Sequence, residues 1–373
     1  MKVSFPYMGN VHHYYKLMHL LGHEVIMPPR PSQRTVDLGV KYSPEFACFP
    51  MKVMLGTYLE VIEKGAEVIV SSGGKGPCRA GFYGETQRAI LKNMGFDTQL
   101  LIVDGPYIGI RKLLKIISII KGKNSWRRLF QVGTIIYRQM KYMDELEKQI
   151  QVMKAHEIKK GDCKRVWNKI VSLFNEKDTK EGLDDAYNQS KELLSSIPLH
   201  QVKEEERIKV GIVGEIYVVM EPSVNLDLED FLASKGVEVE RSQYISEWVD
   251  ANLIPKSFKK DNNLHERILE KGKKYIEIII GGHAKETMGH IVDYKERGFD
   301  GVIHLMPFGC LPELVSQSIM PSVMRDLDIP VLTLAIDEQT AVANVYTRVE
   351  AFIDLIRAKK FEHNTKKEEV AFV

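Results

Sequence analysis

The chain has 373 residues, of which 44% are hydrophobic and 27% are charged, and its formal net charge is +2. These values exclude a disordered chain and give no reason to expect binding to nucleic acid. A chain of this length has enough apolar residues to bury the cores of two domains.

Cysteine usage and hydropathy indicate the compartment. The four cysteines, at positions 48, 78, 163 and 310, have no disulfide-like spacing. The sequence shows no signal-peptide pattern, and no apolar run reaches the roughly 18 residues that a membrane-spanning helix needs. We therefore expect a cytoplasmic protein in a reducing environment, with no membrane partner.

The first part of the chain alternates short apolar strands with helical patterns. Strands are predicted at Val3–Phe5, Glu24–Met27, Glu67–Val70 and Thr98–Ile102. Helices are predicted between them at His12–Leu21, Pro50–Lys64 and Gly84–Met94. This alternation is typical of a parallel sheet and predicts a first α/β domain over residues 1–107.

Residues 108–201 change to long charged helical patterns and are predicted as a helical insertion, with helices at Tyr137–Glu157 and Cys163–Leu194. A second α/β domain is predicted over residues 202–359, with strands at Ile208–Gly214, Ile276–Ile280, Gly301–Leu305 and Val331–Ile336. Residues 360–373 are predicted as a charged C-terminal tail, with fraying from Arg357 onward. The predicted fold class is α/β, with two Rossmann-like parallel-sheet domains and a helical insertion.

Three cysteines stand just ahead of predicted helices. Cys48 and Cys310 share a Cys-x-Pro sequence, and Pro is favoured at the first position of a helix. A helix N-terminus favours a thiolate, which is the form of cysteine that binds metals. Cys78 instead ends a glycine-rich turn after a predicted strand, and glycine allows the backbone to approach a bulky inorganic group closely.

These thiols have more than one interpretation. Buried, inert core cysteines are the plain alternative, because cysteine is often fully buried. Zinc is a second alternative, but structural zinc sites usually take ligands in close pairs, which this chain lacks. Three isolated thiolates fit a [4Fe–4S] cluster in which one iron has no cysteine ligand. Since open α/β sheets bind ligands beyond the carboxyl ends of their strands, such a cluster is predicted in the cleft between the two domains.

Other residues are candidates for lesser roles. Cys163 lies in a charged stretch that is expected to be exposed, and it is interpreted as a bystander. Lys52, Lys75 and Arg79 are candidates for balancing negative charge on a cluster or ligand. His283 stands between a predicted strand and a helical pattern and is a candidate to contact substrate, with a helix N-cap region as the plain alternative.

The loop Gly211–Glu215 follows a strand but is not predicted to bind nucleotide. It lacks the full G-x-G-x-x-G spacing, and Glu215 has the wrong charge for a phosphate cradle. A G-x-x-x-x-G-K-[ST] loop does not occur in the sequence either. Any ATP hydrolysis is therefore expected to belong to a partner.

Several stretches together resemble a known family. They are Met1–Asn10, Ser43–Glu45 with Cys48–Pro50 and Lys52, Gly76–Gly81, Gly281–His283, Pro307–Cys310, and Asp337-Glu338 with Thr347–Phe352. Over most of its length the chain resembles the iron–sulfur component of 2-hydroxyacyl-CoA dehydratases, and more closely the acyl-CoA dehydratase activase-related or CoA protein activase proteins. Where that family usually continues with His-Thr-Gly after Asp-Glu, this chain has Gln339-Thr340-Ala341.

The resemblance implies a [4Fe–4S] cluster held by Cys48, Cys78 and Cys310, which would serve low-potential electron transfer and dehydration or reduction of an activated substrate. It implies an ATP-dependent activase or other electron donor as partner, an acyl-CoA or other small-molecule substrate, and a homo- or heterodimer. A non-catalytic electron relay or activase partner is the alternative reading. A redox-inert α/β binding protein with buried thiols is the third.

Overall fold

The computed structural model describes residues 1–73, 78–103, 109–253, 264–278 and 280–371. Two four-stranded sheets organise the chain, and the strands pair in parallel throughout both. The first sheet has the order β2-β1-β3-β4, from β1 (Lys2–Ser4), β2 (Glu24–Val25), β3 (Val68–Ser71) and β4 (Gln99–Ile102). The second has the order β6-β5-β7-β8, from β5 (Ile208–Gly214), β6 (Val237–Arg241), β7 (Gly301–Pro307) and β8 (Val331–Ile336). The predicted fold class, with two Rossmann-like parallel sheets, is confirmed.

The helices of the first sheet are α1 (His12–Leu20), α2 (Gln33–Tyr42), α3 (Phe49–Glu63) and α4 (Ala80–Asn93). Of these, α3 is the central helix, because it is buried continuously from Phe49 to Val61. Two glycines let α2 approach it closely. A Cβ on Gly39 would lie 1.9 Å from the Lys52 carbonyl oxygen, and one on Gly56 would lie 1.9 Å from that of Thr35. This backbone-to-backbone packing fixes the position of α3 and therefore the position of Cys48 at its N-terminus.

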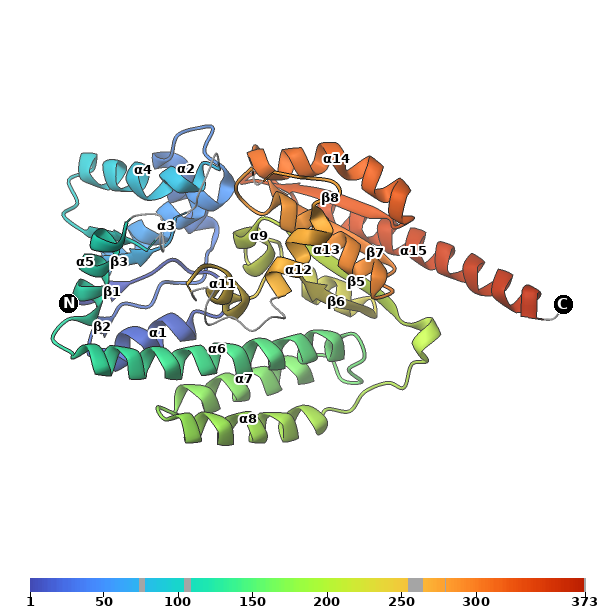
Figure 1. Ribbon diagram of the computed structural model, residues 1–373, viewed down its shortest axis with the longest axis horizontal. Coiled ribbons are helices and arrows are strands. Elements are labelled where there is room, and N and C mark those ends of the chain that lie inside the picture. Colours follow the sequence, from blue (N-terminus) through green and yellow to red (C-terminus); the bar gives the residue numbers. More distant parts are fainter. Residues whose placement is uncertain (74–77, 104–108, 254–263, 279, 372–373) are drawn as a thin grey trace.

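A helical layer follows, made of α5 (Ile110–Lys121), α6 (Trp126–Lys154), α7 (Asp162–Asn175) and α8 (Lys180–Ser195). Figure 1 shows α6 running beneath both sheets, with α7 and α8 beyond it. The predicted single helix Cys163–Leu194 is wrong, because the chain breaks between α7 and α8. Thr179 caps α8 there by accepting a hydrogen bond from the Gly182 N–H at 3.1 Å.

The helices around the second sheet are α9 (Ile216–Met220), α10 (Leu228–Ser234), α11 (Ile245–Asn252), α12 (Leu264–Gly272), α13 (Ala284–Glu296), α14 (Leu311–Leu327) and α15 (Val342–Ala371). Helix α15 continues past Arg357 to Ala371 (Figure 1), and the predicted fraying of this end stays a prediction. The domain boundaries after residues 107, 201 and 359 remain predictions.

One strand of the second sheet was placed in the wrong segment by sequence reasoning. The described residues of 276–280 form no strand; Ile276 is buried, but Ile278 is 69% exposed, so the apolar run does not lie within a sheet. The remaining strand of this sheet is instead β6, whose sequence Val-Glu-Val-Glu-Arg alternates valine with charged residues before it ends at Arg241. Its Glu238 and Arg241 are buried, because the fold supplies partners for them that the local sequence does not reveal.

The two sheets share one apolar core. A single cluster of buried side chains contains Val53, Tyr58 and Ile69 from the first sheet and its helices, and Ile212 and Ile303 from the second sheet. Hydrogen bonds also cross between the two parts: the Tyr217 hydroxyl donates to the Tyr7 carbonyl at 2.8 Å, and the Gly9 N–H donates to Glu221 at 3.0 Å. The relative position of the two sheets is therefore set by packing as well as by the connecting chain.

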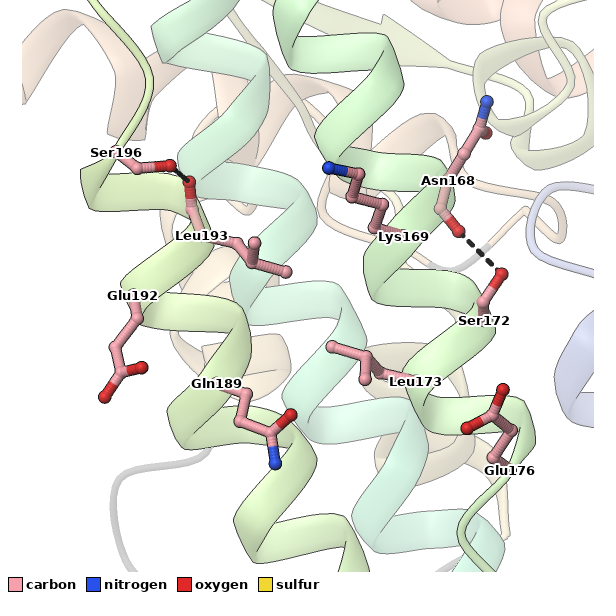
Figure 2. Close-up of a pocket in the computed structure, with 9 residues that line it drawn as sticks. All are labelled: Asn168, Lys169, Ser172, Leu173, Glu176, Gln189, Glu192, Leu193 and Ser196. Atoms are coloured by element: carbon pink, nitrogen blue, oxygen red, sulfur yellow. Dashed lines mark hydrogen bonds between the residues drawn. The ribbon is translucent and has the colours of Figure 1, made fainter.

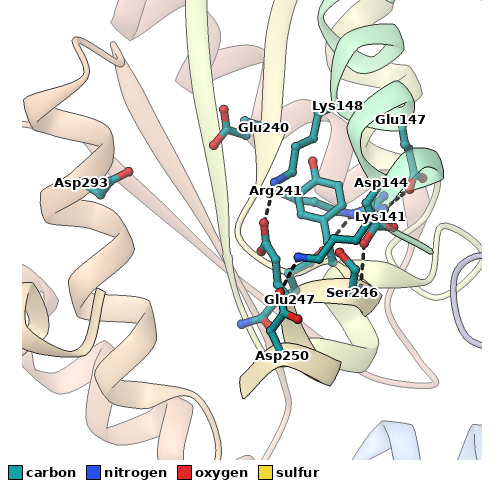
Figure 3. Close-up of polar contacts among 12 residues, drawn as sticks. Lys141, Asp144, Glu147, Lys148, Glu240, Arg241, Ser246, Glu247, Asp250 and Asp293 are labelled. Carbon is teal, nitrogen blue, oxygen red and sulfur yellow. Dashed lines mark hydrogen bonds and ion pairs between the residues drawn. The ribbon is translucent and has the colours of Figure 1, made fainter. Parts of the chain in front are cut away.

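Charged side chains fasten α6 to β6 and α11 (Figure 3). Arg241 of β6 is only 4% exposed and bonds to Glu147 of α6 at 2.7 Å and to Glu229 of α10 at 3.2 Å. Lys148 of α6 pairs with Glu247 of α11 at 2.5 Å. A buried guanidinium needs such partners, so this network joins the helical layer to the second sheet.

We expect Arg241→Met to lower the free energy of unfolding by about 3–5 kcal/mol, because it leaves two largely buried carboxylates without their common cation. Lys235→Met is the matched control: Lys235 pairs with Glu350 at 2.7 Å on the surface, where the loss should be at most about 1 kcal/mol. Urea denaturation of both variants measures the difference. Equal losses would contradict a structural role for the network.

Asp144 gives the same region a pH dependence. Its carboxyl group is 5% exposed and accepts from the Ser246 N–H at 2.8 Å; burial, and then the charge of Glu147, raises its pKa to about 7. A carboxyl whose pKa is raised on folding favours the native state at low pH, and this contribution is lost as the pH rises from about 4 to about 7. Wild-type protein should lose thermal stability across this window relative to Asp144→Asn. If the melting temperatures of the two proteins change with pH by the same amount between about pH 4 and about pH 7, the raised pKa of Asp144 is contradicted.

Candidate functional site

The three predicted site cysteines lie at junctions between the sheets and their helices. Cys48 is the N-cap of α3 and Cys310 is the N-cap of α14, each with a proline in the following helical turn. This is the position that their Cys-x-Pro sequences predict. Cys78 lies between β3 and α4, directly before the N-cap residue Arg79. We refer to Cys48, Cys78 and Cys310 as the thiol site.

The cysteines of the thiol site act on one another electrostatically. Cys48 and Cys310 are each 7% exposed, and Cys78 is half-buried. Burial raises the pKa of Cys48 to about 12 and also raises the pKa of Cys78 and of Cys310. Repulsion adds to this effect, since the charge of Cys78 raises the pKa of Cys48 and that of Cys48 raises the pKa of Cys310. Because such repulsion weakens with distance, Cys48 of the first sheet's helix α3 and Cys310 of α14 are near enough for their charges to interact; that all three cysteines hold one group stays a prediction.

Two residues of the α4 region tie Cys78 and Cys48 together. The Cys48 thiol is in hydrogen-bond contact with the Tyr83 hydroxyl of α4. The Arg79 guanidinium donates to the carbonyl of Phe46, just ahead of Cys48, and its charge lowers the pKa of Cys78 against the larger effect of burial. Arg79 is thus a neighbour of Cys78 and Cys48, and its charge-balancing role stays a prediction.

Sequence reasoning missed a carboxylate in this neighbourhood. Glu215 follows β5 and caps α9, its side chain accepting from the Val218 N–H at 3.0 Å. It is placed by Gly214, which has φ +136° and lies so close to β7 that a Cβ would be 1.8 Å from the Leu305 carbonyl oxygen. The charge of Glu215 raises the pKa of all three thiols of the site. Its position after the first strand of the second sheet is the available signal in the sequence, because ligands of open α/β sheets bind beyond the carboxyl ends of the strands.

A second carboxylate, Glu313, lies in the first turn of α14 and is fully buried. Its charge raises the pKa of Cys310 and of Cys78. Glu313 was not a sequence candidate, since a glutamate near a helix start is ordinarily a capping residue. Together with the thiols, these carboxylates make the neighbourhood rich in potential negative charge.

The remaining candidates divide between the thiol site and other contacts. His283 is the N-cap residue of α13, and its charge acts on Glu215, lowering the pKa of that carboxyl against the effect of burial. Lys52 is buried and pairs with Glu338 at 2.5 Å, so its charge is already balanced within the protein. Lys75 lies outside the described residues.

The donor chemistry of the site fits a cationic, thiophilic group. In the described part of the chain, no group of three or more His, Cys, Asp or Glu side chains has the arrangement of a metal site, and Cys48 contacts Tyr83 instead. The charges nevertheless point to one kind of occupant. The charge of Glu215 raises the pKa of all three thiols, and that of Glu313 raises the pKa of Cys78 and Cys310; a bound cation would offset this repulsion and favour the thiolates. Soft thiolate ligands suit iron–sulfur clusters and zinc.

Cys163 is not exposed, contrary to the sequence prediction. It is fully buried in the core of the helical layer, with Ile170 and Phe174 on the same side of α7. The charged residues around it in sequence lie on the other faces of an amphipathic helix. Burial, and then the charge of Glu157, raises the pKa of its thiol to about 12. Cys163 therefore packs in the core of the helical layer, separately from the thiol site.

A groove of about 700 Å³ lies elsewhere, between α7 and α8 (Figure 2). Apolar Leu173 and Leu193 face each other across it, and its rim is polar, with Lys169, Glu176 and Glu192. None of the four cysteines lines it.

Among the helices that the structure describes, none is long and apolar enough to cross a lipid bilayer.

Two families match parts of this chain. Residues 110–356, well over half of the chain, match the family 2-hydroxyglutaryl-CoA dehydratase, D-component. Residues 2–71 match the CoA enzyme activase uncharacterised domain. Cys310 falls within the first match and Cys48 within the second, whereas Cys78 falls between them. No curated protein matches the sequence.

Thiol reactivity checks the placement of the four cysteines. In metal-free native protein at pH 8, we expect iodoacetamide to modify half-buried Cys78 first, and Cys48 and Cys310 more slowly because burial raises their pKa. Cys163 should react only after unfolding, because it is fully buried. Mass spectrometry of the peptides over time gives the order. Native modification of Cys163 as fast as that of Cys78 would contradict the described packing.

Proposed function

Because the chain belongs to the 2-hydroxyglutaryl-CoA dehydratase D-component family, we propose that it is the cluster-bearing component of a 2-hydroxyacyl-CoA dehydratase-like system. In this proposal Cys48, Cys78 and Cys310 hold a [4Fe–4S] cluster in which one iron has no cysteine ligand. When bound, the cluster would supply low-potential electrons and a Lewis-acidic iron for dehydration or reduction of an activated substrate.

The observation that carries the proposal is the electrostatic coupling of thiols from both sheets. Cys48 and Cys78 belong to the first sheet and its helices and Cys310 to the second, yet their charges act on one another. Inert core cysteines have no need to lie beside carboxylates, yet the charge of Glu215 disfavours all three thiolates and that of Glu313 disfavours those of Cys78 and Cys310. A cationic occupant supplies a reason for this arrangement.

Side chains around the thiols have definable tasks in this proposal. The Tyr83 hydroxyl contacts the Cys48 thiol and would limit access of water to it. The charge of His283 lowers the pKa of Glu215 against the effect of burial, so His283 would stabilise that carboxylate beside the site. The Lys52–Glu338 ion pair joins α3 to the segment after β8 and would keep Cys48 and the second sheet in register. Arg79 would offset negative charge at Cys78.

A non-catalytic electron relay is the second candidate, and one surface feature favours it. Phe46, Phe82 and Phe308 are 82%, 70% and 68% exposed, although large aromatic side chains are usually buried. Each lies within four residues of a cysteine of the thiol site. Exposed aromatic side chains mark docking surfaces, so a protein partner could reach the site here.

Partners and compartment complete the proposal. The match to a CoA enzyme activase domain supports an ATP-dependent activase or another electron donor as partner, and a CoA thioester as substrate. The resemblance to this family also leads us to propose that the chain forms a homodimer or a heterodimer. All four cysteines are free, which supports a reducing cytoplasm as the working compartment.

Iron and sulfide content of anaerobically purified protein tests the cluster. We expect wild-type protein to contain both, and Cys48→Ala, Cys78→Ala and Cys310→Ala each to lose most of them. Cys163→Ala is the matched control and should keep the wild-type content, because Cys163 lies in the core of the helical layer. Wild-type protein without iron would leave the redox-inert binding protein as the surviving reading. Loss of iron from Cys163→Ala alone would overturn the ligand assignment.

A further inference from the structure

Glu313 has a buried carboxylate oxygen that lacks a partner. The residue and its neighbour His304 of β7 are both 0% exposed. His304 Nε2 lies 2.8 Å from Glu313 Oε2, and the Thr287 hydroxyl donates to the same oxygen at 3.2 Å. Within the described part of the chain, the other oxygen, Oε1, is buried and accepts no hydrogen bond. Burying a carboxylate oxygen in this way is costly unless something binds it.

Helix capping does not account for Glu313. It stands at the third position of α14, where a glutamate commonly reaches back to the N-cap backbone N–H. That N–H, of Cys310, donates instead to the Pro307 carbonyl at 3.1 Å. The Glu313 side chain turns to His304 and Thr287, so its direction is set by the sheet and by α13.

Contacts on both ring nitrogens fix the orientation of the His304 side chain beside Glu313. Its Nδ1 lies 3.2 Å from the Thr333 hydroxyl on β8, while its Nε2 faces Glu313. With the proton on Nε2, the ring donates to Glu313 and accepts from Thr333, so both nitrogens are satisfied. The imidazole therefore fixes one oxygen of Glu313 and leaves the other for a different partner.

The thiol site is the neighbour that could use that oxygen. Glu313 lies one helical turn after Cys310, and its backbone N–H donates to the Cys310 thiol, so the two residues are direct neighbours at the start of α14. Glu215 acts on the same thiols, but its carboxylate already accepts from the Val218 N–H. Of the two carboxylates, Glu313 is the one with a buried oxygen that accepts no hydrogen bond from the described residues.

We propose that Glu313 is an oxygen donor to the metal group held by Cys48, Cys78 and Cys310, and that His304 is the positioning residue that fixes it. The inference rests on the proposed function and deepens it by naming a protein ligand for the position without a cysteine. A substrate that binds at that position would have to displace the Glu313 carboxylate, whereas an electron relay would keep it bound.

Co²⁺ titration of metal-free, reduced protein tests the donor without requiring a cluster. Thiolate-to-Co²⁺ absorption reports binding at the cysteines, and the visible ligand-field bands report the other donors. Glu313→Gln should weaken Co²⁺ binding by about tenfold or more and change the ligand-field bands, and His304→Leu should shift both in the same direction. His304→Gln, which retains an N–H donor, should restore part of the wild-type behaviour.

Glu215→Gln is the matched control, since it removes a negative charge beside the same thiols without removing the proposed donor. It should leave the ligand-field bands as in wild-type protein. In protein loaded with iron and sulfide, Glu313→Gln should retain the iron but change the electron paramagnetic resonance spectrum of the reduced state.

Unchanged Co²⁺ bands in Glu313→Gln would overturn the inference, and so would a change of the same size in Glu215→Gln. Wild-type protein that binds Co²⁺ but never iron and sulfide would overturn the proposed cluster while the Co²⁺ comparison still decides the role of Glu313. Thermal melts identify any variant that fails to fold. Glu313→Asp, which keeps the charge but shortens the side chain, then serves as the second variant, and unchanged bands there also count against the donor.

Discussion

Burial of several acidic groups at one place is the constraint on which the rest of this structure depends. Cys48, Cys78 and Cys310 come from both sheets, and Glu215 and Glu313 add carboxylates to the same neighbourhood. Burial and the charge of Glu215 both raise the pKa of the three thiols, so the two effects act in the same direction. Such an arrangement disfavours the thiolates by itself, and the cationic group that we propose would favour them.

A site built from both sheets requires that the sheets keep their relative position. The structure meets this requirement at several levels: a shared apolar core, the Lys52–Glu338 ion pair, and the hydrogen bond from Tyr217 to Tyr7. Helix α6 adds a further connection, because it packs on α1 and is fastened to β6 through the buried Arg241. The helical layer therefore helps to hold the two sheets in their relative position.

The surroundings of the thiols combine two properties that are seldom found together. The sulfur atoms of Cys48 and Cys310 are largely protected, while Phe46 and Phe308, two residues before each, are exposed. Protection suits a group that must avoid water, and exposed aromatic rings suit contact with another protein. Both properties agree with a component that receives electrons from a partner. Whether substrate chemistry follows on this chain depends on the fourth position of the proposed cluster, where Glu313 becomes important.

Local sequence patterns determined the α/β class, most of the parallel strands and the position of Cys48 and Cys310 at helix starts, because period and proline placement act over a few residues. The tertiary structure alone decided which charges are buried. The strand β6 was missed because the partners of its Arg241 lie on α6 and α10, and Cys163 was misplaced because its charged neighbours in sequence point away from the core. The roles of Glu215 and Glu313 were invisible for the same reason: a carboxylate is defined by what surrounds it in space, and no local pattern encodes that.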